Sequence, residues 1–309
     1  MTPKVSVVIP VYNSEKTLES LVAGLEVNLR DDWTPFEIVL VDDGSIDNSW
    51  NRICQLALQK SHVLAIRLSK NFGQHQAILA GVERSKGTVT AIMDCDLQDQ
   101  PSDIPKVLSK LSEGFDIVVT TTGPSHQSPL RRIFRSAYFG LIAWSSTTKI
   151  EPNLGTIVAF NKKVREGYLA VRDQHRHTNL VLAWLGFNRT SVEVEKLPSR
   201  ARMSTYSFAK LVTHALTGSL ASSTRLLSFA MSLGGFLMLL SAIASLLVLR
   251  AGLLFNPQAG WVSLMLVMLL LGGVTIFFLG AIGFYVGKTF EQLRGRPTYL
   301  VDSEIDSQR

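Results

Sequence analysis

The sequence has few cysteines and lacks the common nucleotide-binding fingerprints. Its two cysteines, Cys54 and Cys95, are too few for a disulfide framework or a zinc ribbon, which suits a reducing compartment for the folded part. No G-x-G-x-x-G follows the first apolar run and no G-x-x-x-x-G-K-S/T occurs, which argues against a dinucleotide enzyme and a P-loop ATPase. The first residues contain no apolar stretch, so we expect no signal peptide. Any nucleotide must be bound in another way.

Charged residues are also scarce, at 18% of the 309 residues, whereas 46% are hydrophobic. This composition excludes disordered and collagen-like classes. It is too apolar for an ordinary soluble enzyme and too charged for a chain that lies wholly in a membrane. The 31 basic residues exceed the 25 acidic ones, which gives a net charge of +6. Three partners suit this excess: nucleic acid, an anionic membrane or a phosphorylated substrate.

Two long uncharged runs predict membrane helices. Residues 226–249 and 251–287 carry no charge, and Arg250 alone separates them. Each run exceeds the ~20 residues that a helix needs to cross a hydrocarbon core of ~30 Å. Two buried helices of a soluble protein are the alternative, but such helices rarely run this long without a polar stripe. We therefore expect a transmembrane hairpin over 226–287, with spans at about 226–249 and 261–286.

Basic residues flank these runs. They are Lys196, Arg200, Arg202, Lys210 and Arg225 before the first run and Lys288, Arg294 and Arg296 after the second. The positive-inside rule therefore places both termini in the cytoplasm, as in a multi-pass protein of the plasma (inner) membrane, with residues 288–309 as a tail. Apolar residues at helical spacing from Phe208 to Leu220 predict a juxtamembrane amphipathic helix over 204–225 that lies on the membrane surface.

Residues 1–203 predict a cytoplasmic α/β domain with a mostly parallel sheet. Short runs of branched apolar residues, typical of strands buried on both faces, occur at Lys4–Pro10, Phe36–Val41, Val63–Leu68, Thr88–Met93 and Phe115–Thr120. Helix-like segments such as Glu15–Leu29 and Ser49–Gln59 alternate with them. Ligands of such sheets bind beyond the carboxyl ends of the strands, and the residues that follow these runs are unusually polar.

The triplet Asp94-Cys95-Asp96 follows the fourth run. Two carboxylates this close repel unless a divalent cation lies between them and an anionic substrate, and Mg²⁺ typically binds one or two carboxylates plus substrate phosphates. A nucleotide diphosphate is the natural partner, although the triplet taken alone could be a solvated acidic turn. Asp42 directly follows the second run and is another ligand candidate, whereas Asp47 or Ser45 is expected to cap the next helix.

Four ordered motifs carry a resemblance to a known family. They are Val8-Ile-Pro-Val-Tyr-Asn13, Val41-Asp-Asp-Gly-Ser45, Asn71-Phe-Gly73 and Asp94-Cys-Asp-Leu-Gln-Asp99 with Pro101. They resemble the motifs of inverting family-two glycosyltransferases, which have the nucleotide-sugar-binding GT-A fold. The paired apolar runs followed by Arg296-Pro-Thr-Tyr299 narrow the resemblance to polyisoprenyl-phosphate glycosyltransferases, the group of bactoprenol glucosyltransferases and dolichyl-phosphate mannose synthases.

The resemblance implies roles for particular residues. Pro10, Tyr12 and Asp42 would contact the base and ribose, Lys70 would lie near the donor phosphates, and Asp94, Asp96 and Gln98 would hold the ribose and a Mg²⁺ or Mn²⁺ ion. The chemistry agrees, because Tyr12 offers a stacking face, Lys70 a point charge and Asp96 a hard oxygen ligand. For His75, donor-sugar contact and plain packing are equally open.

Two positions depart from the family pattern. The family's Tyr-Asn-Glu is Tyr12-Asn13-Ser14 here, with Glu15 one place later. Many relatives carry an acidic candidate base where this chain has Asn153, which cannot accept a proton in that role. Catalysis survives this change if the acceptor is a phosphate monoester, since its second pKa of ~6 leaves it largely ionised near neutral pH.

The acceptor phosphate requires cations. The candidates are Arg131 and Arg135, in a basic and aromatic segment, and Arg200 and Arg202, beside the expected membrane helices. Contact with anionic lipid headgroups is the alternative role for these four arginines.

Together these features predict a hexosyltransferase that moves a sugar from a nucleotide-diphosphate sugar to a polyisoprenyl (undecaprenyl) phosphate on the cytoplasmic leaflet. One alternative is a membrane-anchored glycosyltransferase that acts directly on a glycolipid or polysaccharide. A nucleic-acid-binding scaffold is disfavoured, because the basic residues after Glu195 cluster beside the expected spans. The bilayer is an expected partner. A homo-oligomer is open, since Gly234-Gly235 and Gly272-Gly273 permit close helix contact.

Overall fold

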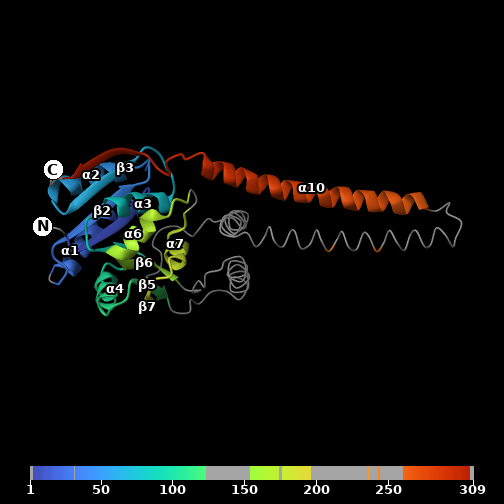
Figure 1. Ribbon diagram of the computed structural model, residues 1–309. Coiled ribbons are helices and arrows are strands. Elements are labelled where there is room, and N and C mark those ends of the chain that lie inside the picture. Colours follow the sequence, from blue (N-terminus) through green and yellow to red (C-terminus); the bar gives the residue numbers. More distant parts are fainter. Residues whose placement is uncertain are drawn as a thin grey trace. The chain divides into compact units, whose positions relative to one another are not determined.

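The computed structural model describes residues 3–30, 32–122, 154–173, 176–195, 236, 243 and 260–306. The chain forms two compact units. The first contains the described residues up to Glu195 together with Pro297–Asp306, and the second contains a long helix, α10 (Gly260–Leu293). Figure 1 labels elements of both units where there is room.

The first unit is built on an eight-stranded sheet of order β7-β5-β6-β4-β1-β2-β3-β8. From one edge to the other, the strands are β7 (Arg189–Val194), β5 (Ile117–Thr122), β6 (Leu154–Asn161), β4 (Val89–Ile92), β1 (Val5–Val11), β2 (Phe36–Asp42), β3 (Val63–Leu68) and β8 (Val301–Asp306). Strands β4, β1, β2 and β3 are parallel neighbours, as are β5 and β7. The pairs β4–β6, β5–β6 and β3–β8 are antiparallel. The expected α/β domain with a mostly parallel sheet is confirmed.

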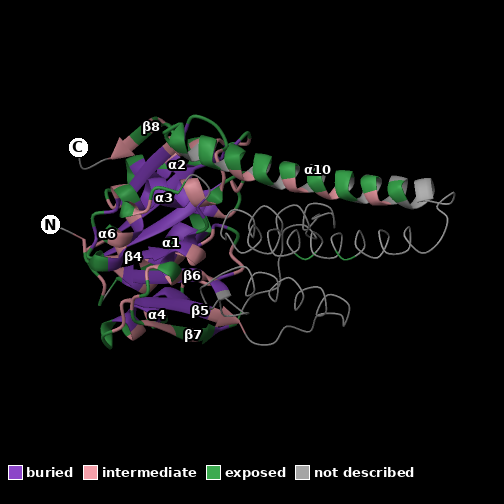
Figure 2. Cartoon of the chain, turned by 45° about the vertical axis from the view of Figure 1, so that its right-hand side comes forward, coloured by how far each residue is buried: buried purple, intermediate pink, exposed green. Residues whose placement is uncertain are grey.

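Helices cover both faces of this sheet. On one face lie α1 (Leu18–Leu29), α2 (Ser49–Gln59) and α4 (Asp103–Ser112), and on the other lie α3 (Gln74–Arg84), α6 (Lys162–Ala170) and α7 (Thr178–Trp184). Successive side chains of a strand point to opposite faces, so Ile38 packs under the first group of helices and Val39 under the second. The central strands are therefore buried on both sides, as Figure 2 shows.

The sequence-based boundaries hold best for the central elements. Strand β3 and helix α2 begin and end at the expected residues. Helix α1 begins at Leu18 instead of Glu15, because the preceding residues form a turn in which the Thr17 amide donates to the Ser14 carbonyl (3.2 Å).

Residues 288–309 were expected to form a tail, but part of this segment is a strand of the sheet. Val301–Asp306 is strand β8, which pairs antiparallel with β3 and completes the sheet of the first unit. The chain therefore leaves this unit and returns to it after α10, so the catalytic domain expected over 1–203 also contains residues from the end of the chain.

The expected membrane segments are described only in part. Helix α10 has 34 residues and extends seven residues beyond the expected end of the second span, from 287 to 293. Its backbone is described throughout, but its side chains at only part of the positions. Counting only the described residues, no helix is both long and apolar enough to cross a membrane. The juxtamembrane helix expected at 204–225 and the first span expected at 226–249, apart from Phe236 and Ile243, lie outside the described residues.

Candidate active site

Four loops meet at the carboxyl ends of the parallel strands β4, β1, β2 and β3. They begin at Tyr12, Asp43, Ser69 and Met93. Because these strands are neighbours and run in the same direction, their loops emerge at one edge of the sheet. The polar motifs of the sequence therefore come together there.

Hydrogen bonds join the β1 loop to the β2 loop. The amide of Asn13 donates to Ser45 Oγ (3.0 Å), and the Asn13 side chain accepts from the Ile46 amide (3.0 Å). The amide of Ser14 donates to Ser49 Oγ (2.8 Å), at the start of α2. Asn13 has a positive φ of 51°, which asparagine tolerates better than most residues. Short polar side chains thus fix these two loops against each other.

Asp43 joins the β2 loop to the β3 loop. Its carboxylate accepts hydrogen bonds from the amides of Phe72 (2.7 Å) and Gly73 (2.9 Å), and its side chain is almost fully buried. Burial raises the pKa of Asp43, and the two amide hydrogen bonds act in the opposite direction. The β3 loop carries Lys70, whose exposed ammonium lies 5.0 Å from the centre of the Phe72 ring.

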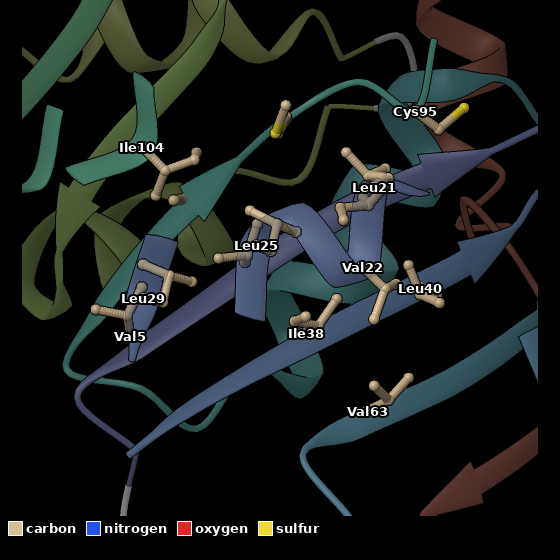
Figure 3. Close-up of a cluster of buried hydrophobic side chains, with 14 of the residues drawn as sticks. Val5, Leu21, Val22, Leu25, Leu29, Ile38, Leu40, Val63, Cys95 and Ile104 are labelled. Atoms are coloured by element: carbon tan, nitrogen blue, oxygen red, sulfur yellow. The ribbon is translucent and has the colours of Figure 1, made fainter. Parts of the chain in front are cut away.

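The Asp94-Cys95-Asp96 triplet is anchored in the protein core. Cys95 is 9% exposed and belongs to the apolar cluster drawn in Figure 3. Its carbonyl accepts from Thr17 Oγ1 (2.7 Å), and its thiol lies 3.1 Å from Ser14 Oγ. On either side of the buried Cys95, Asp96 is exposed and Asp94 is half-buried. Asp94 accepts from the Gln74 side chain (2.7 Å), which links the triplet to the start of α3.

The triplet fits a hard divalent cation that is bound by the protein and by a substrate together. Asp96 Oδ1 accepts from the Gln98 amide (3.0 Å), while Oδ2 accepts no hydrogen bond from the described residues. Within the described part of the chain, no three His, Cys, Asp or Glu side chains gather in a group able to hold an ion. Mg²⁺ is commonly bound by one or two carboxylates plus phosphate oxygens. Asp94 and Asp96 therefore suit an ion that completes its shell with a donor diphosphate.

The remaining nucleotide candidates differ in exposure. Tyr12 is 46% exposed, and its ring is accessible for stacking on a base. Gln98 is half-buried. Pro10 is buried within β1. Asp42 is fully buried, where it accepts from the Ser45 amide (3.3 Å) and lies 3.5 Å from Arg67 Nε. Contacts of Pro10 and Asp42 with the base and ribose stay predictions. Among Pro10, Tyr12, Asp42, Lys70 and Gln98, only Tyr12 and Lys70 are exposed.

Glu15, the displaced carboxylate of the Tyr-Asn-Glu motif, turns toward α2. Its side chain accepts from the Asn48 amide (3.2 Å). Asp47 accepts from the Ser49 amide (3.0 Å), but the N-cap residue of α2 is Asn48, so the expected cap at Asp47 or Ser45 is wrong. Asn153, Arg131, Arg135, Arg200 and Arg202 lie outside the described residues.

His75 packs between helices. Its Nδ1 atom lies 3.1 Å from Thr178 Oγ1, and its ring centre lies 4.3 Å from that of His177. Burial, together with the neighbouring His177, lowers the pKa of His75 to about 4. His75 is therefore neutral at neutral pH, and its contacts join α3 to the start of α7. Of the two roles considered, the described contacts favour packing.

This burial predicts acid sensitivity. An unfolded histidine takes up a proton as the pH falls below 6.5, but folded His75 does so only near pH 4, so stability falls across that window. At pH 5 the loss should reach about 2 kcal/mol. The His75→Gln variant should show a smaller fall in thermal midpoint between pH 7.5 and 5.0 than the wild type. Equal falls in the two proteins would contradict the prediction.

Several residues that build this edge were missed at the level of sequence. Thr17, Asp43 and Gln74 each bond to a loop that is distant in the chain. Of these three residues, only Asp43 lies in a motif that the sequence revealed, because it adjoins Asp42 in Asp-Asp-Gly-Ser.

A mostly parallel, helix-covered sheet with an aspartate pair at its carboxyl edge is the architecture of a GT-A nucleotide-sugar-binding domain, the domain of a class of glycosyltransferases. The family model "Glycosyl transferase family 2" matches residues 6–170. The chain belongs to this family and is a glycosyltransferase.

Similar proteins agree with this assignment. The chain is 33% identical to an uncharacterized glycosyltransferase of Synechocystis, over 97% of this chain and 95% of that protein. It is 31% identical to an undecaprenyl-phosphate 4-deoxy-4-formamido-L-arabinose transferase of Pectobacterium atrosepticum, over 98% and 94% of the two chains. Among solved structures, glucosyl-3-phosphoglycerate synthase of Mycobacterium tuberculosis, in complex with Mn²⁺ and UDP-glucose, gives a TM-score of 0.50 at 18% identity, over 70% of this chain and 79% of that one. This last likeness concerns the fold.

Proposed function

We propose that the protein transfers a sugar from a nucleotide-diphosphate sugar to undecaprenyl phosphate, with inversion at the sugar carbon C1. The observation that carries the proposal is the loop edge, where the aspartate pair and Lys70 flank the carboxyl ends of β4 and β3. The end-to-end similarity to undecaprenyl-phosphate sugar transferases supports a lipid phosphate as the acceptor.

In this proposal the loops orient the donor. Tyr12 stacks on the base, and Lys70 contacts the diphosphate. Asp94, Asp96 and Gln98 hold Mg²⁺ or Mn²⁺, and Pro10 and Asp42 shape the floor below the base and ribose. The bound ion supplies positive charge that neutralises the departing nucleoside diphosphate. The Gln74 hydrogen bond keeps Asp94 oriented toward the edge (2.7 Å).

The acceptor attacks without a protein base. An ionised phosphate oxygen of the lipid forms the new bond to C1 while the bond from C1 to the nucleoside diphosphate breaks. Asn153 cannot take a proton, and none has to be removed, since the monoester is largely ionised near neutral pH. Arg131, Arg135, Arg200 and Arg202 hold the acceptor phosphate, and in-line alignment of the two substrates supplies much of the rate.

We further propose that residues 226–287 cross the plasma membrane twice. Strand β8 pairs within the same sheet as β1–β3, so the chain before and after the apolar segments must lie on one side of any membrane. The number of crossings is then even, and the sequence holds two uncharged runs of sufficient length. Large apolar side chains of α10, such as Leu264, Met268 and Ile282, are exposed, as expected of a lipid-facing helix. The flanking basic residues place the sheet in the cytoplasm.

Labelling of cysteines in intact cells tests this topology. Ala259→Cys, between the expected spans 226–249 and 261–286, should react with a membrane-impermeant maleimide, whereas Ser307→Cys, beyond β8, should react only after lysis. The wild type, which keeps Cys54 and Cys95, gives the background. Reaction of Ser307→Cys in intact cells, or protection of Ala259→Cys, would contradict the hairpin.

A panel assay tests the function. Purified protein with Mn²⁺ is incubated with nucleotide sugars, including hexoses and 4-deoxy-4-formamido-L-arabinose, with and without undecaprenyl phosphate. Release of nucleoside diphosphate should require the lipid, and the sugar should appear on the lipid. Equal release without lipid, or transfer to a glycolipid or polysaccharide in its place, would refute the acceptor assignment.

A further inference from the structure

The loop that carries Lys70 is anchored at both ends by distant parts of the chain. At its start, the Ser69 amide donates to the Leu300 carbonyl (2.9 Å). At its end, the amides of Phe72 and Gly73 donate to the buried Asp43 carboxylate. Lys70 and Asn71 lie between these anchors and are exposed. The conformation of Lys70 thus depends on both attachments, one of which comes from residues that follow α10.

Side chains attach the C-terminal segment Tyr299–Asp306 to α3 and to Lys86, two residues beyond the end of α3. The Tyr299 hydroxyl donates to Glu83 and accepts from Arg84 Nη1 (3.1 Å). Arg84 also pairs with Glu304 (2.8 Å), and Lys86 pairs with Asp306 (3.0 Å).

Apolar contacts add to these polar ones. Tyr299 and Val301 pack against the same buried cluster as Phe72 of the Lys70 loop. Loss of the Tyr299 ring should therefore loosen the C-terminal segment and, through the hydrogen bond from Ser69 to Leu300, the Lys70 loop as well.

Protection of a sheet edge does not account for this arrangement. An added strand can cover the edge of β3 by pairing along the strand alone. Here the contact continues past the end of β3, at Leu68, to Ser69 in the loop. The register also shifts between Arg67 and Leu68, and such bulges commonly redirect the chain next to active sites. The contact beyond the strand end points to a role in the loop.

We propose that the C-terminal segment Tyr299–Asp306 positions the Lys70 loop for the donor diphosphate, with Tyr299 and Leu300 as positioning residues. The inference rests on the proposed function, in which Lys70 contacts that diphosphate. The donor site is then complete only after the chain has passed through α10 and returned to the sheet.

The test uses the full-length protein and the nucleotide sugar that the panel assay identifies. Tyr299→Ala should raise the KM for the donor by about tenfold, because a small misplacement of a binding group is costly, and should leave the KM for undecaprenyl phosphate unchanged. Hydrogen exchange of the peptide that covers Ser69–Gly73 should be faster. In a Lys70→Ala background, Tyr299→Ala should change the donor KM no further, because the two residues act through one contact.

Phe187→Ala is the matched control. Phe187 is a partly buried aromatic residue on the same apolar cluster, with a cation, Lys163, 4.8 Å from its ring centre, as Arg84 lies 6.0 Å from that of Tyr299. This variant should leave the donor KM and the Ser69–Gly73 exchange at wild-type values. If Tyr299→Ala does not fold, Tyr299→Phe, which keeps the ring and removes the hydroxyl, carries the same test with a smaller effect.

The outcomes separate this inference from the proposed function. Wild-type donor KM in the folded Tyr299 variants, exchange no faster than in Phe187→Ala, or additivity with Lys70→Ala would each overturn the positioning role. If the wild type transfers no sugar from any donor in the panel, the proposed function fails. The exchange measurement then decides by itself whether the C-terminal segment holds the loop.

Discussion

Asp96→Asn should lower the rate of sugar transfer by about 10³-fold, since a metal ion supplies several kcal/mol of transition-state stabilisation. The thermal midpoint should stay close to that of the wild type. Asparagine has the shape of aspartate, and its carbonyl oxygen can still accept the hydrogen bond from the Gln98 amide. The loop conformation is thereby kept, while the exposed negative charge is lost.

A titration with Mn²⁺ isolates the role of this charge. If Asp96 holds the ion, Asp96→Asn should need a higher Mn²⁺ concentration for half-maximal transfer. The matched control is Glu113→Gln, which removes an exposed carboxylate after α4, remote in sequence from the loops of the site, and should transfer sugar at the wild-type rate with wild-type Mn²⁺ dependence. Full transfer by Asp96→Asn would refute the assignment of the metal ligand.

The core of the sheet could be predicted from sequence because its strands are buried on both faces. Burial on both faces requires a continuous apolar run, and Val63–Leu68 is such a run. The edge strands give no such signal. In β8, Val301–Asp306, apolar residues occur only at the first and fifth positions, since an edge strand is half exposed. Its pairing with β3 joins residues more than 200 positions apart, which local periodicity cannot reveal.

The candidate site shows the same division. Sequence predicted which loops would meet, because parallel neighbouring strands end at one edge. It singled out Asp42 as a ligand candidate and gave Asp43 no role. Asp42 is the last residue of β2 and is held inside by Ser45 and Arg67, whereas Asp43 reaches across to the Lys70 loop. Such roles depend on contacts between segments distant in sequence.

Gly44 lies where the β2 loop touches the Lys70 loop, and Gly44→Ala should abolish most transfer. Gly44 has a φ of +67°, and an added Cβ would lie 2.5 Å from the Asn71 nitrogen, against 3.4 Å for an ordinary contact. The backbone neighbours cannot rotate away, so the Lys70 loop must shift by close to 1 Å, a displacement that can cost about 10²-fold in rate.

Gly114→Ala separates this clash from the cost of the backbone conformation. Gly114 also has a positive φ, +104°, but nothing lies within 4 Å of its added Cβ. Both variants therefore lose about 1–3 kcal/mol from the strained backbone, and only Gly44→Ala adds the clash, which costs about 1–3 kcal/mol more. Thermal midpoints should fall in both and further in Gly44→Ala, while Gly114→Ala keeps its transfer rate. Equal transfer rates in the two variants would mean that contact between the β2 and β3 loops does not position the donor.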